Sequence, residues 1–265
     1  MSAAAVQVDR SYLRHELMPL YRRNVRIWLR VPSAVLPPLF IPVFFLVVNS
    51  SALEGITALP IFENVNYVSF IIPVSLLMTV AAAGSGSGLA LVQDIDTGYF
   101  DKMLLAPIRR SSILLSKLMM DATRAALQAM LVIAVGLTVG GSIATGIPGG
   151  LLLVAMAFLF GLAYSGISIN IALRTGSPEA TQASFVIFFP LVFLAPTFVP
   201  LEMLADWLQV VARFNPVSYV IIGLRALTVE GYVAGDLLGA FVAIGGLGLV
   251  TMTGAFRALA ARAAQ

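Results

Sequence analysis

The residues that could do chemistry concentrate between Gln93 and Leu118, a polar interval that lies between two long apolar runs. Its charges, together with two just beyond it, are Asp94, Asp96, Asp101, Lys102, Arg109, Arg110, Lys117, Asp121 and Arg124. Only 11% of the chain is charged, so this cluster predicts a shaped polar surface for a partner protein. An ordinary solvated hairpin is the alternative that the residues leave open.

Catalysis has few possible participants. His15 is the only histidine and cysteine is absent, which excludes Ser-His-Asp chemistry, thiolate chemistry and multi-histidine metal sites. No GxxxxGK[ST] motif occurs, so if the protein uses ATP, another polypeptide must bind it. We therefore assign this chain no catalytic residue, no metal and no cofactor of its own. The net charge of +3 is distributed between apolar runs, which argues against nucleic acid as a partner.

Composition places the 265-residue chain among membrane proteins. Hydrophobic residues make up 59% of it and the mean hydropathy is +0.96, whereas soluble domains average about 45–50% apolar and about 25% charged residues. No cleavable signal peptide is evident, because the first apolar run follows six arginines and lacks a cleavage site. We expect one all-α integral membrane domain over residues 1–265.

Six apolar windows are long enough to cross a hydrocarbon core of about 30 Å, which takes roughly 20 helical residues. They are Ser33–Leu53, Tyr67–Val92, Ala122–Ile143, Gly149–Leu173, Ala183–Leu201 and Leu237–Ala258. The first is rich in proline, which predicts an irregular start. Six spans put both termini on one side, and fourteen Lys and Arg residues then lie on that side against two on the other. This bias predicts cytoplasmic termini.

Two further segments flank or interrupt the spans. Residues 11–30 place apolar side chains among arginines, which predicts an amphipathic helix in the cytoplasmic interface that contacts membrane lipids, with Arg22, Arg23 and Arg26 toward anionic lipid and Trp28 at headgroup depth. Pro19 is expected to interrupt it, and a disordered basic tail is the alternative. Residues 200–236 predict two short outer re-entrant helices that are split at Asn215-Pro216.

Small residues and the scarcity of buried acids narrow the function further. Gly84 and Gly88 are four residues apart in an apolar run, a spacing that favours close helix packing within the subunit over a subunit interface. Acidic residues lie in loops or at span ends, which argues against a proton-coupled transporter and against a channel with a charged selectivity filter. A membrane enzyme lacks a clustered catalytic set, whereas a membrane scaffold without transport activity stays possible.

Within residues 94–117, we expect a short helix from Asp96 to Leu105 that ends before Pro107. Acidic residues would then lie at its N-terminus, and Met103, Leu104 and Leu105 would form an apolar edge. Arg109, Arg110 and Lys117 would follow on the helix that leads into the third span. Such a helix at the cytoplasmic surface would fit a cleft on a soluble partner protein that supplies the energy for movement.

Two motifs resemble the type-2 ABC exporter permeases, in the daunorubicin-resistance permease branch. The first consists of Asp94, Gly98, Leu104, Leu105, Pro107, Arg110 and Lys117. The second is FNPVSYVIIGLRAL at residues 214–227, which contains Asn215, Pro216 and Tyr219. The resemblance covers nearly the whole chain. It departs from the family pattern at Asp94, where glutamate is common, and at Ser116, where glycine is common.

The resemblance implies a permease of the cell inner (plasma) membrane that pairs with a second permease, expected to be an identical copy, and with two ATPase subunits that bind ATP and Mg²⁺. It makes residues 94–117 the region that couples the permease to the ATPase. Hydrophobic or amphipathic cargo such as a drug or lipid would cross an apolar path, for which Phe44, Phe70, Phe185 and Phe189 are candidates. Core packing or lipid contact is the alternative for these phenylalanines, and export of a lipid-linked glycan is the alternative function.

Overall fold

The computed structural model describes residues 10–30, 36–52 and 66–263, and every regular element in these ranges is a helix. Residues 33–35 and Leu53, at the two ends of the first predicted window, lie outside these ranges. The α-helices are α1 (Arg10–Leu29), α2 (Leu36–Ala52), α3 (Tyr67–Gly84), α4 (Gly86–Asp96), α5 (Tyr99–Leu105), α6 (Arg110–Thr138), α7 (Gly146–Thr175), α8 (Pro178–Phe193), α9 (Asp206–Phe214), α10 (Pro216–Arg225) and α11 (Ala234–Arg262). A short 3-10 helix, η4 (Leu201–Met203), precedes α9, and a π-helical turn, η5 (Ala226–Glu230), follows α10.

Within the described ranges, four unbent helical segments are long and apolar enough to cross a membrane: α3 continued by α4, then α6, α7 and α11. Each of the four contains 29 or 30 residues. The predicted spans at α2 and α8 are shorter, with 17 and 16 residues. At a rise of 1.5 Å per residue, 16 residues extend for only about 24 Å. Helix length and composition therefore support four of the six predicted crossings.

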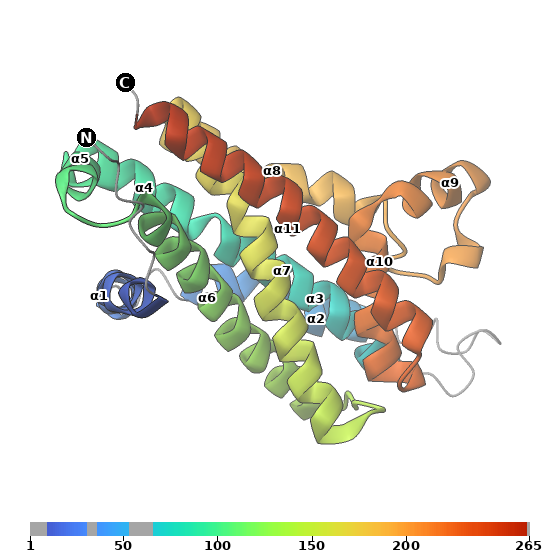
Figure 1. The fold of residues 1–265 in the computed structure, drawn as a ribbon. Coiled ribbons are helices and arrows are strands. Elements are labelled where there is room, and N and C mark those ends of the chain that lie inside the picture. The colour runs from blue at the N-terminus through green and yellow to red at the C-terminus, as the bar shows by residue number, and fades with distance from the viewer. Residues whose placement is uncertain (1–9, 31–35, 53–65, 264–265) are drawn as a thin grey trace.

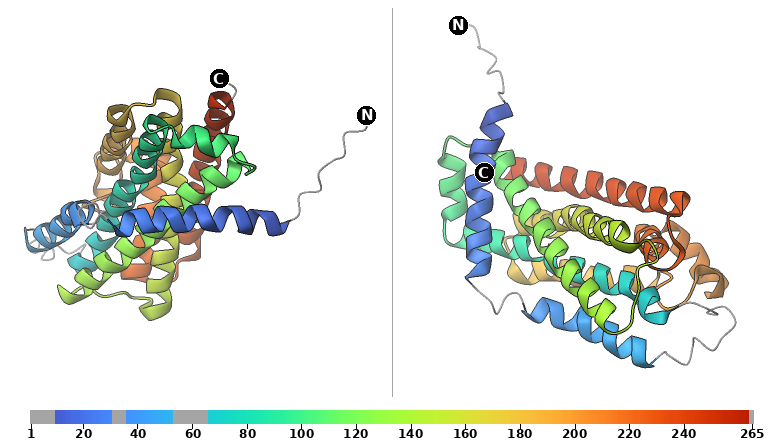
Figure 2. Two further views of the ribbon diagram at one scale, coloured as in Figure 1. Left: turned by 90° about the vertical axis from the view of Figure 1, so that its left-hand side faces the viewer. Right: turned by 90° about the horizontal axis from the view of Figure 1, so that it is seen from below.

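The long helices run side by side, and α1 lies across them (Figures 1 and 2). The helices α1 and α5 and the C-terminal end of α11 lie at one end of the bundle, which we call the α5 end (Figure 1). The α6–α7 turn and α9 lie at the opposite end, which we call the α9 end. The two ends of the described chain are thus on the same side of the bundle.

α7 is the central helix and packs against α11, α6, α4 and α3. Small residues permit this packing: a Cβ on Gly88 would come within 2.9 Å of the backbone of Ser168 on α7. The hydroxyl of Ser168 donates a hydrogen bond to the carbonyl of Gly84, at 2.6 Å. The GxxxG pattern therefore packs two helices of one chain together, which confirms the within-subunit prediction.

Several predicted boundaries were wrong. The third window was extended to Ile143, but α6 ends at Thr138; its start at Arg110 agrees with the expected helix that leads into the third span. The fifth window extended to Leu201, but α8 ends at Phe193. Pro19 does not interrupt α1, which is continuous over 20 residues. Hydropathy locates apolar residues, whereas helices extend into polar sequence wherever packing and hydrogen bonds support them.

The segment between α8 and α11 contains the two predicted short helices. Asn215 ends α9 and begins α10, accepting a hydrogen bond from the amide of Val217 at 3.0 Å. Pro216 occupies the first turn of α10, where its missing N–H group needs no partner. The axis bends by 92° between α9 and residues 216–230. The predicted split at Asn215-Pro216 is therefore correct.

Candidate functional site

The short helix α5 lies between α4 and α6 in the chain and at the outer edge of the α5 end of the bundle (Figure 1). Gly98 precedes it in the left-handed conformation, with φ 68°, a region that side chains other than glycine or asparagine rarely adopt. Phe100 and Met103 are buried in a hydrophobic cluster with residues of α4, α6, α7 and α11. Leu105, at the last residue of the helix, is 87% exposed. The helix is thus anchored along one side and presents an apolar side chain at its end.

Four further residues of the predicted coupling set are exposed: Asp101 on α5, and Asp96, Pro107 and Arg110 before and after it. Lys102 on α5, which was not in that set, is exposed as well. Leu104 is partly buried. The prediction of acidic residues at the N-terminus of the helix was wrong for Asp94 and Asp96, which lie in the last turn of α4 because Gly98 turns the chain only afterwards.

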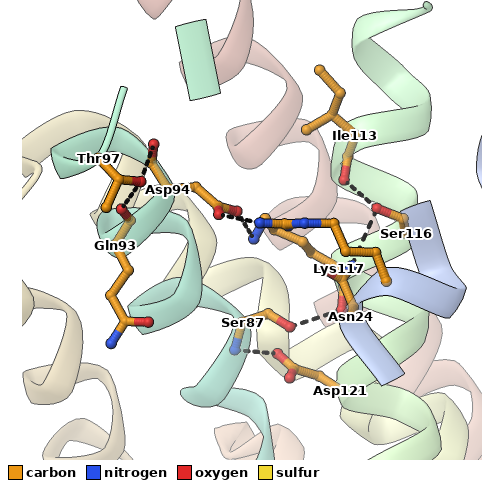
Figure 3. A network of polar contacts seen from close by, with 10 residues as sticks. Asn24, Ser87, Gln93, Asp94, Thr97, Ile113, Ser116, Lys117 and Asp121 are labelled. Atoms are coloured by element: carbon orange, nitrogen blue, oxygen red, sulfur yellow. Dashed lines mark hydrogen bonds and ion pairs between the residues drawn. The ribbon is translucent and has the colours of Figure 1, made fainter. Parts of the chain in front are cut away.

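Asp94 and Lys117 are not part of this exposed surface. Their side chains form a buried ion pair, with Lys117 Nζ 2.7 Å from Asp94 Oδ2 (Figure 3). The other carboxylate oxygen of Asp94 accepts a hydrogen bond from Arg23 Nη2 of α1, at 3.0 Å. The Arg23 guanidinium also lies 3.9 Å from the centre of the Tyr99 ring. The Asp94 carboxylate therefore joins α4 to α1 and to α6. Its partner Arg23 also connects α1 to Tyr99 at the start of α5.

A second set of polar contacts lies one turn further along α6. The Asp121 side chain is fully buried and accepts hydrogen bonds from the amide of Ser87, at 3.2 Å, and from Arg124 Nη1, at 3.3 Å. The hydroxyl of Ser87 donates to the carbonyl of Lys117, at 2.9 Å (Figure 3). These contacts fix α4 against α6 directly beside the Asp94 pair.

The Glu16 carboxylate on α1 also binds two uncharged groups at the start of α6. Glu16 accepts hydrogen bonds from the amide of Arg109, at 3.0 Å, and from the hydroxyl of Ser112, at 2.9 Å. The Arg109 hydrogen bond is the main cause that lowers the pKa of Glu16 below its ordinary value; burial opposes it and the Ser112 hydrogen bond adds to it. The Tyr21 hydroxyl lies 2.9 Å from Thr123 Oγ1.

Of the residues predicted to face lipid, two are exposed and two contact side chains of other helices. Arg22 and Arg26 are exposed, whereas Arg23 forms an ion pair with Asp94. Trp28 is half-buried, and its ring centre lies 5.8 Å from the Arg124 guanidinium. The expectation that all three arginines face lipid was therefore wrong for Arg23.

The second motif lies at the α9 end and makes its contacts through backbone groups. Asn215 Nδ2 donates a hydrogen bond to the carbonyl of Leu191 in α8. Tyr219, partly exposed, donates its hydroxyl hydrogen to the carbonyl of Arg213, at 2.8 Å. Arg225 is buried, donates to the carbonyl of Thr197 at 3.1 Å, and lies 3.5 Å from the centre of the Phe70 ring.

The four candidate path phenylalanines do not converge on one site. Phe185 and Phe189 line a cavity of about 510 Å³ between α1, α2, α3–α4, α6 and α8. Phe70 is instead buried beneath Arg225, and Phe44 is 56% exposed and stacked on Phe40. No group of three His, Asp or Glu residues within the described ranges is placed to hold a metal ion.

Glu16 and Gln128 were not named in the sequence analysis, and Asp121 and Arg124 were counted there only among the charges beside the polar interval. Asp121, Arg124 and Gln128 continue from Lys117 at intervals of four, three and four residues, which places the four side chains on one face of α6. That periodicity was available in the sequence. The contact of Glu16 with Arg109 joins residues 93 positions apart, and no local pattern indicated it.

The fold and these contacts define a multi-pass helical membrane protein with a small helix exposed at one end. Residues 15–229 match the ABC-2 type transporter family, and the chain belongs to that family as a permease component. It is 30% identical over 199 residues to a putative transport permease, ycf38, of Cyanophora paradoxa, a match that covers 74% of this chain and 66% of the relative. The chain thus spans just under two thirds of that relative's length.

Two drug-resistance permeases are also similar. A probable doxorubicin resistance ABC transporter permease protein, DrrC, of Mycobacterium tuberculosis is 23% identical over 226 residues, covering 84% of this chain and 80% of the relative. The daunorubicin resistance ABC transporter permease protein DrrB1 of Streptomyces coeruleorubidus is 24% identical over 197 residues, covering 74% of this chain and 69% of the relative. The resemblance drawn from the two motifs is confirmed.

Proposed function

We propose that the chain is the permease of an ATP-driven exporter and that α5 is its contact with a separate ATPase subunit. The observation that carries this proposal is the exposure of Leu105, at 87%, on a short helix whose other apolar side chains are anchored in the bundle. An exposed apolar side chain with exposed charges beside it, here Asp101 and Lys102, agrees with the apolar centre and polar rim of a protein interface.

The buried ion pairs give this contact a mechanical consequence. Asp94 lies four residues before Gly98 and binds both α1 and α6, so a displacement of α5 is transmitted to three elements together. Closure of the ATPase shifts the permease between two conformations only if the closed ATPase binds one of them more tightly. α5 supplies the surface for that difference in affinity, and the Asp94 pairs supply a stiff connection to the spans.

The assembled transporter then contains two permease copies and two ATPase subunits, with ATP and Mg²⁺ on the ATPase. α2 and α8 complete six crossings of the inner (plasma) membrane, an even number that agrees with the position of α1, α5 and the end of α11 at one end of the bundle (Figure 1). The fourteen-to-two distribution of basic residues favours that end as the cytoplasmic one. The drug-resistance names of the relatives support an amphipathic or hydrophobic cargo that moves outward.

The test is a transport assay with the partner ATPase, in membranes or proteoliposomes. Leu105→Asp is expected to lower ATP-driven export about tenfold or more, because a charge at the centre of an apolar contact loses the desolvated anchor. Leu105→Met, which keeps an apolar side chain of similar volume, is expected to retain most of the activity. Equal export by all three proteins would contradict the assignment of α5.

Gly98 provides a second, backbone-based test. Gly98→Val forces a β-branched residue into the left-handed region, which costs about 1–2 kcal/mol or shifts the start of α5. Gly98→Asn is the matched control, since asparagine tolerates this conformation. Export should fall for valine and stay near the wild-type value for asparagine.

A further inference from the structure

The helix α9 (Asp206–Phe214) carries an apolar side that the described part of the chain leaves largely uncovered. Trp207, Val210, Val211 and Phe214 follow one another at intervals of three, one and three residues, which places them on one side of the helix. Their exposed fractions are 64%, 57%, 36% and 86%. Ala212, on the opposite side, is buried. The apolar side of α9 therefore points away from the protein.

The polar groups of α9 are arranged the other way round. The Gln209 amide is turned toward the preceding chain and donates hydrogen bonds to the carbonyls of Leu204, at 2.9 Å, and Glu202, at 3.4 Å. Asp206 and Arg213 are exposed and, seven positions apart, share one flank of the helix. A helix at a boundary between protein and water normally turns its apolar side inward. The inverse orientation of α9 indicates surroundings that are less polar than water.

α9 lies apart from the long helices, at the periphery of the molecule (Figures 1 and 2). Its main contacts within the described chain are with α10 and η4. α10 differs from it, because Val217, Val220 and Ile221 of α10 are buried in the core, and the axis bends by 92° between the two segments. The two helices that were predicted to be re-entrant together thus have different surroundings, and only α9 presents its apolar side outward.

Two features of this surface favour lipid over a second protein as its partner. The four apolar side chains offer roughly 500 Å², less than the ~800 Å² that each partner of a stable complex buries. Tyr219 and Tyr232, which are 41% and 58% exposed, add two amphipathic rings to Trp207 in the same part of the chain. Tryptophan and tyrosine are enriched where a membrane meets water, because one end of each side chain is apolar and the other can be hydrated. A phospholipid surface therefore matches both the size and the composition.

We propose that α9 is an interfacial anchor whose partner is the phospholipid bilayer at the α9 end of the bundle. Trp207, Val210 and Phe214 lie at the boundary between head groups and acyl chains, and Asp206 and Arg213 face the head groups and water. Under the orientation proposed above, this is the outer leaflet. The anchor acts independently of the contact between α5 and an ATPase, and it fixes the depth of the segment that joins α8 to α11.

Trp207 is a natural reporter of this contact. The chain has two tryptophans, so Trp28→Phe leaves Trp207 as the only one. The full chain is reconstituted in phosphatidylcholine nanodiscs in which the lipid is brominated either near the head group or near the end of its acyl chains. Quenching of Trp207 fluorescence by each lipid, and by acrylamide from the water, measures the depth of the side chain. Depth does not depend on which leaflet is the outer one, so failure of this test and failure of the proposed orientation are distinguishable.

The lipid brominated near the head group should quench Trp207 about twofold more strongly than the lipid brominated at the chain ends, because the indole lies at the boundary. Acrylamide should quench it about threefold less than it quenches free tryptophanamide. Phe214→Gln should lower quenching by the head-group bromolipid by about half, since interfacial binding scales with the apolar area buried. Arg213→Gln, which introduces the same residue on the charged flank, should leave the quenching unchanged.

Four results would overturn the proposal. Strong quenching by acrylamide without quenching by either lipid would place α9 in water. Strongest quenching by the lipid brominated at the chain ends would make α9 a re-entrant helix within the hydrocarbon core. Protection from both lipids and from acrylamide would mean that a protein, such as a second copy of the chain, covers this side. Equal effects of Phe214→Gln and Arg213→Gln would contradict the assigned sides, and should either variant fold poorly, the depth of Trp207 in the otherwise unchanged helix still decides.

Discussion

The two ends of the bundle hold their helices together by different chemistry. At the α5 end, ion pairs between side chains join α1, α4 and α6, with Asp94 binding Lys117 and Arg23. At the α9 end, Asn215, Tyr219 and Arg225 each donate to a backbone carbonyl. The α5 end therefore depends mainly on charge pairs between side chains of different helices, whereas the α9 end depends on hydrogen bonds from side chains to the backbone.

Removing the shared carboxylate should have the largest effect. Asp94→Asn leaves Lys117 buried without its ion-pair partner, and loss of one member of a buried pair typically costs about 3–5 kcal/mol. Unfolding in detergent, followed by circular dichroism, measures the loss. The double variant Asp94→Asn, Lys117→Met removes the uncompensated charge and should recover most of it. A double variant no more stable than Asp94→Asn alone would show that the pair does not connect these helices.

A smaller effect is expected at the other end. Arg225→Met removes the hydrogen bond to the Thr197 carbonyl and the cation–π contact with Phe70, a loss of about 1–3 kcal/mol. Arg225→Lys keeps the charge but not the planar stacking and should recover little of it. The same unfolding measurement applies. Complete recovery by lysine would mean that charge, not geometry, holds this end, and the contrast between the ends would fail.

The smallest effect concerns Glu16 and depends on pH. Because hydrogen bonds from Arg109 and Ser112 lower its pKa, its contribution to the docking of α1 is fully present above its unfolded pKa. The contribution is lost as pH falls through the folded value, below 4.5. Hydrogen exchange at the Arg109 amide, compared with Glu16→Gln at each pH, should be about threefold slower in the wild type at pH 6, and the ratio should approach one as the pH falls through the folded pKa. A constant ratio across this range would contradict the role of the carboxylate.

Much of the fold could be predicted from local sequence. Apolar runs located the long helices, Asn215-Pro216 located the split between α9 and α10, and Gly88 indicated close packing. The end of α8 could not be predicted, because apolar sequence continues past Phe193, where the helix ends. Apolar composition does not distinguish helix from irregular backbone in this window.

The candidate site was predictable only in part. The motif located α5 and its neighbourhood, but the sequence assigned Asp94 and Lys117 to a docking surface although both are buried. Burial depends on α1, which crosses the bundle and supplies Arg23 from a segment 71 positions away. The cavity escaped prediction for the same reason, since its lining comes from five separate parts of the chain.

The central claim, that α5 contacts the ATPase, has a direct test because the chain contains no cysteine. Leu105→Cys and Phe214→Cys introduce single thiols at positions of equal exposure, 87% and 86%, at opposite ends of the bundle. Each variant is coexpressed with the ATPase, labelled with a photoreactive thiol reagent, illuminated and separated by mass. We predict a permease–ATPase adduct from Leu105→Cys and none from Phe214→Cys. An ATPase that copurifies with both variants but yields no adduct from Leu105→Cys would contradict the account.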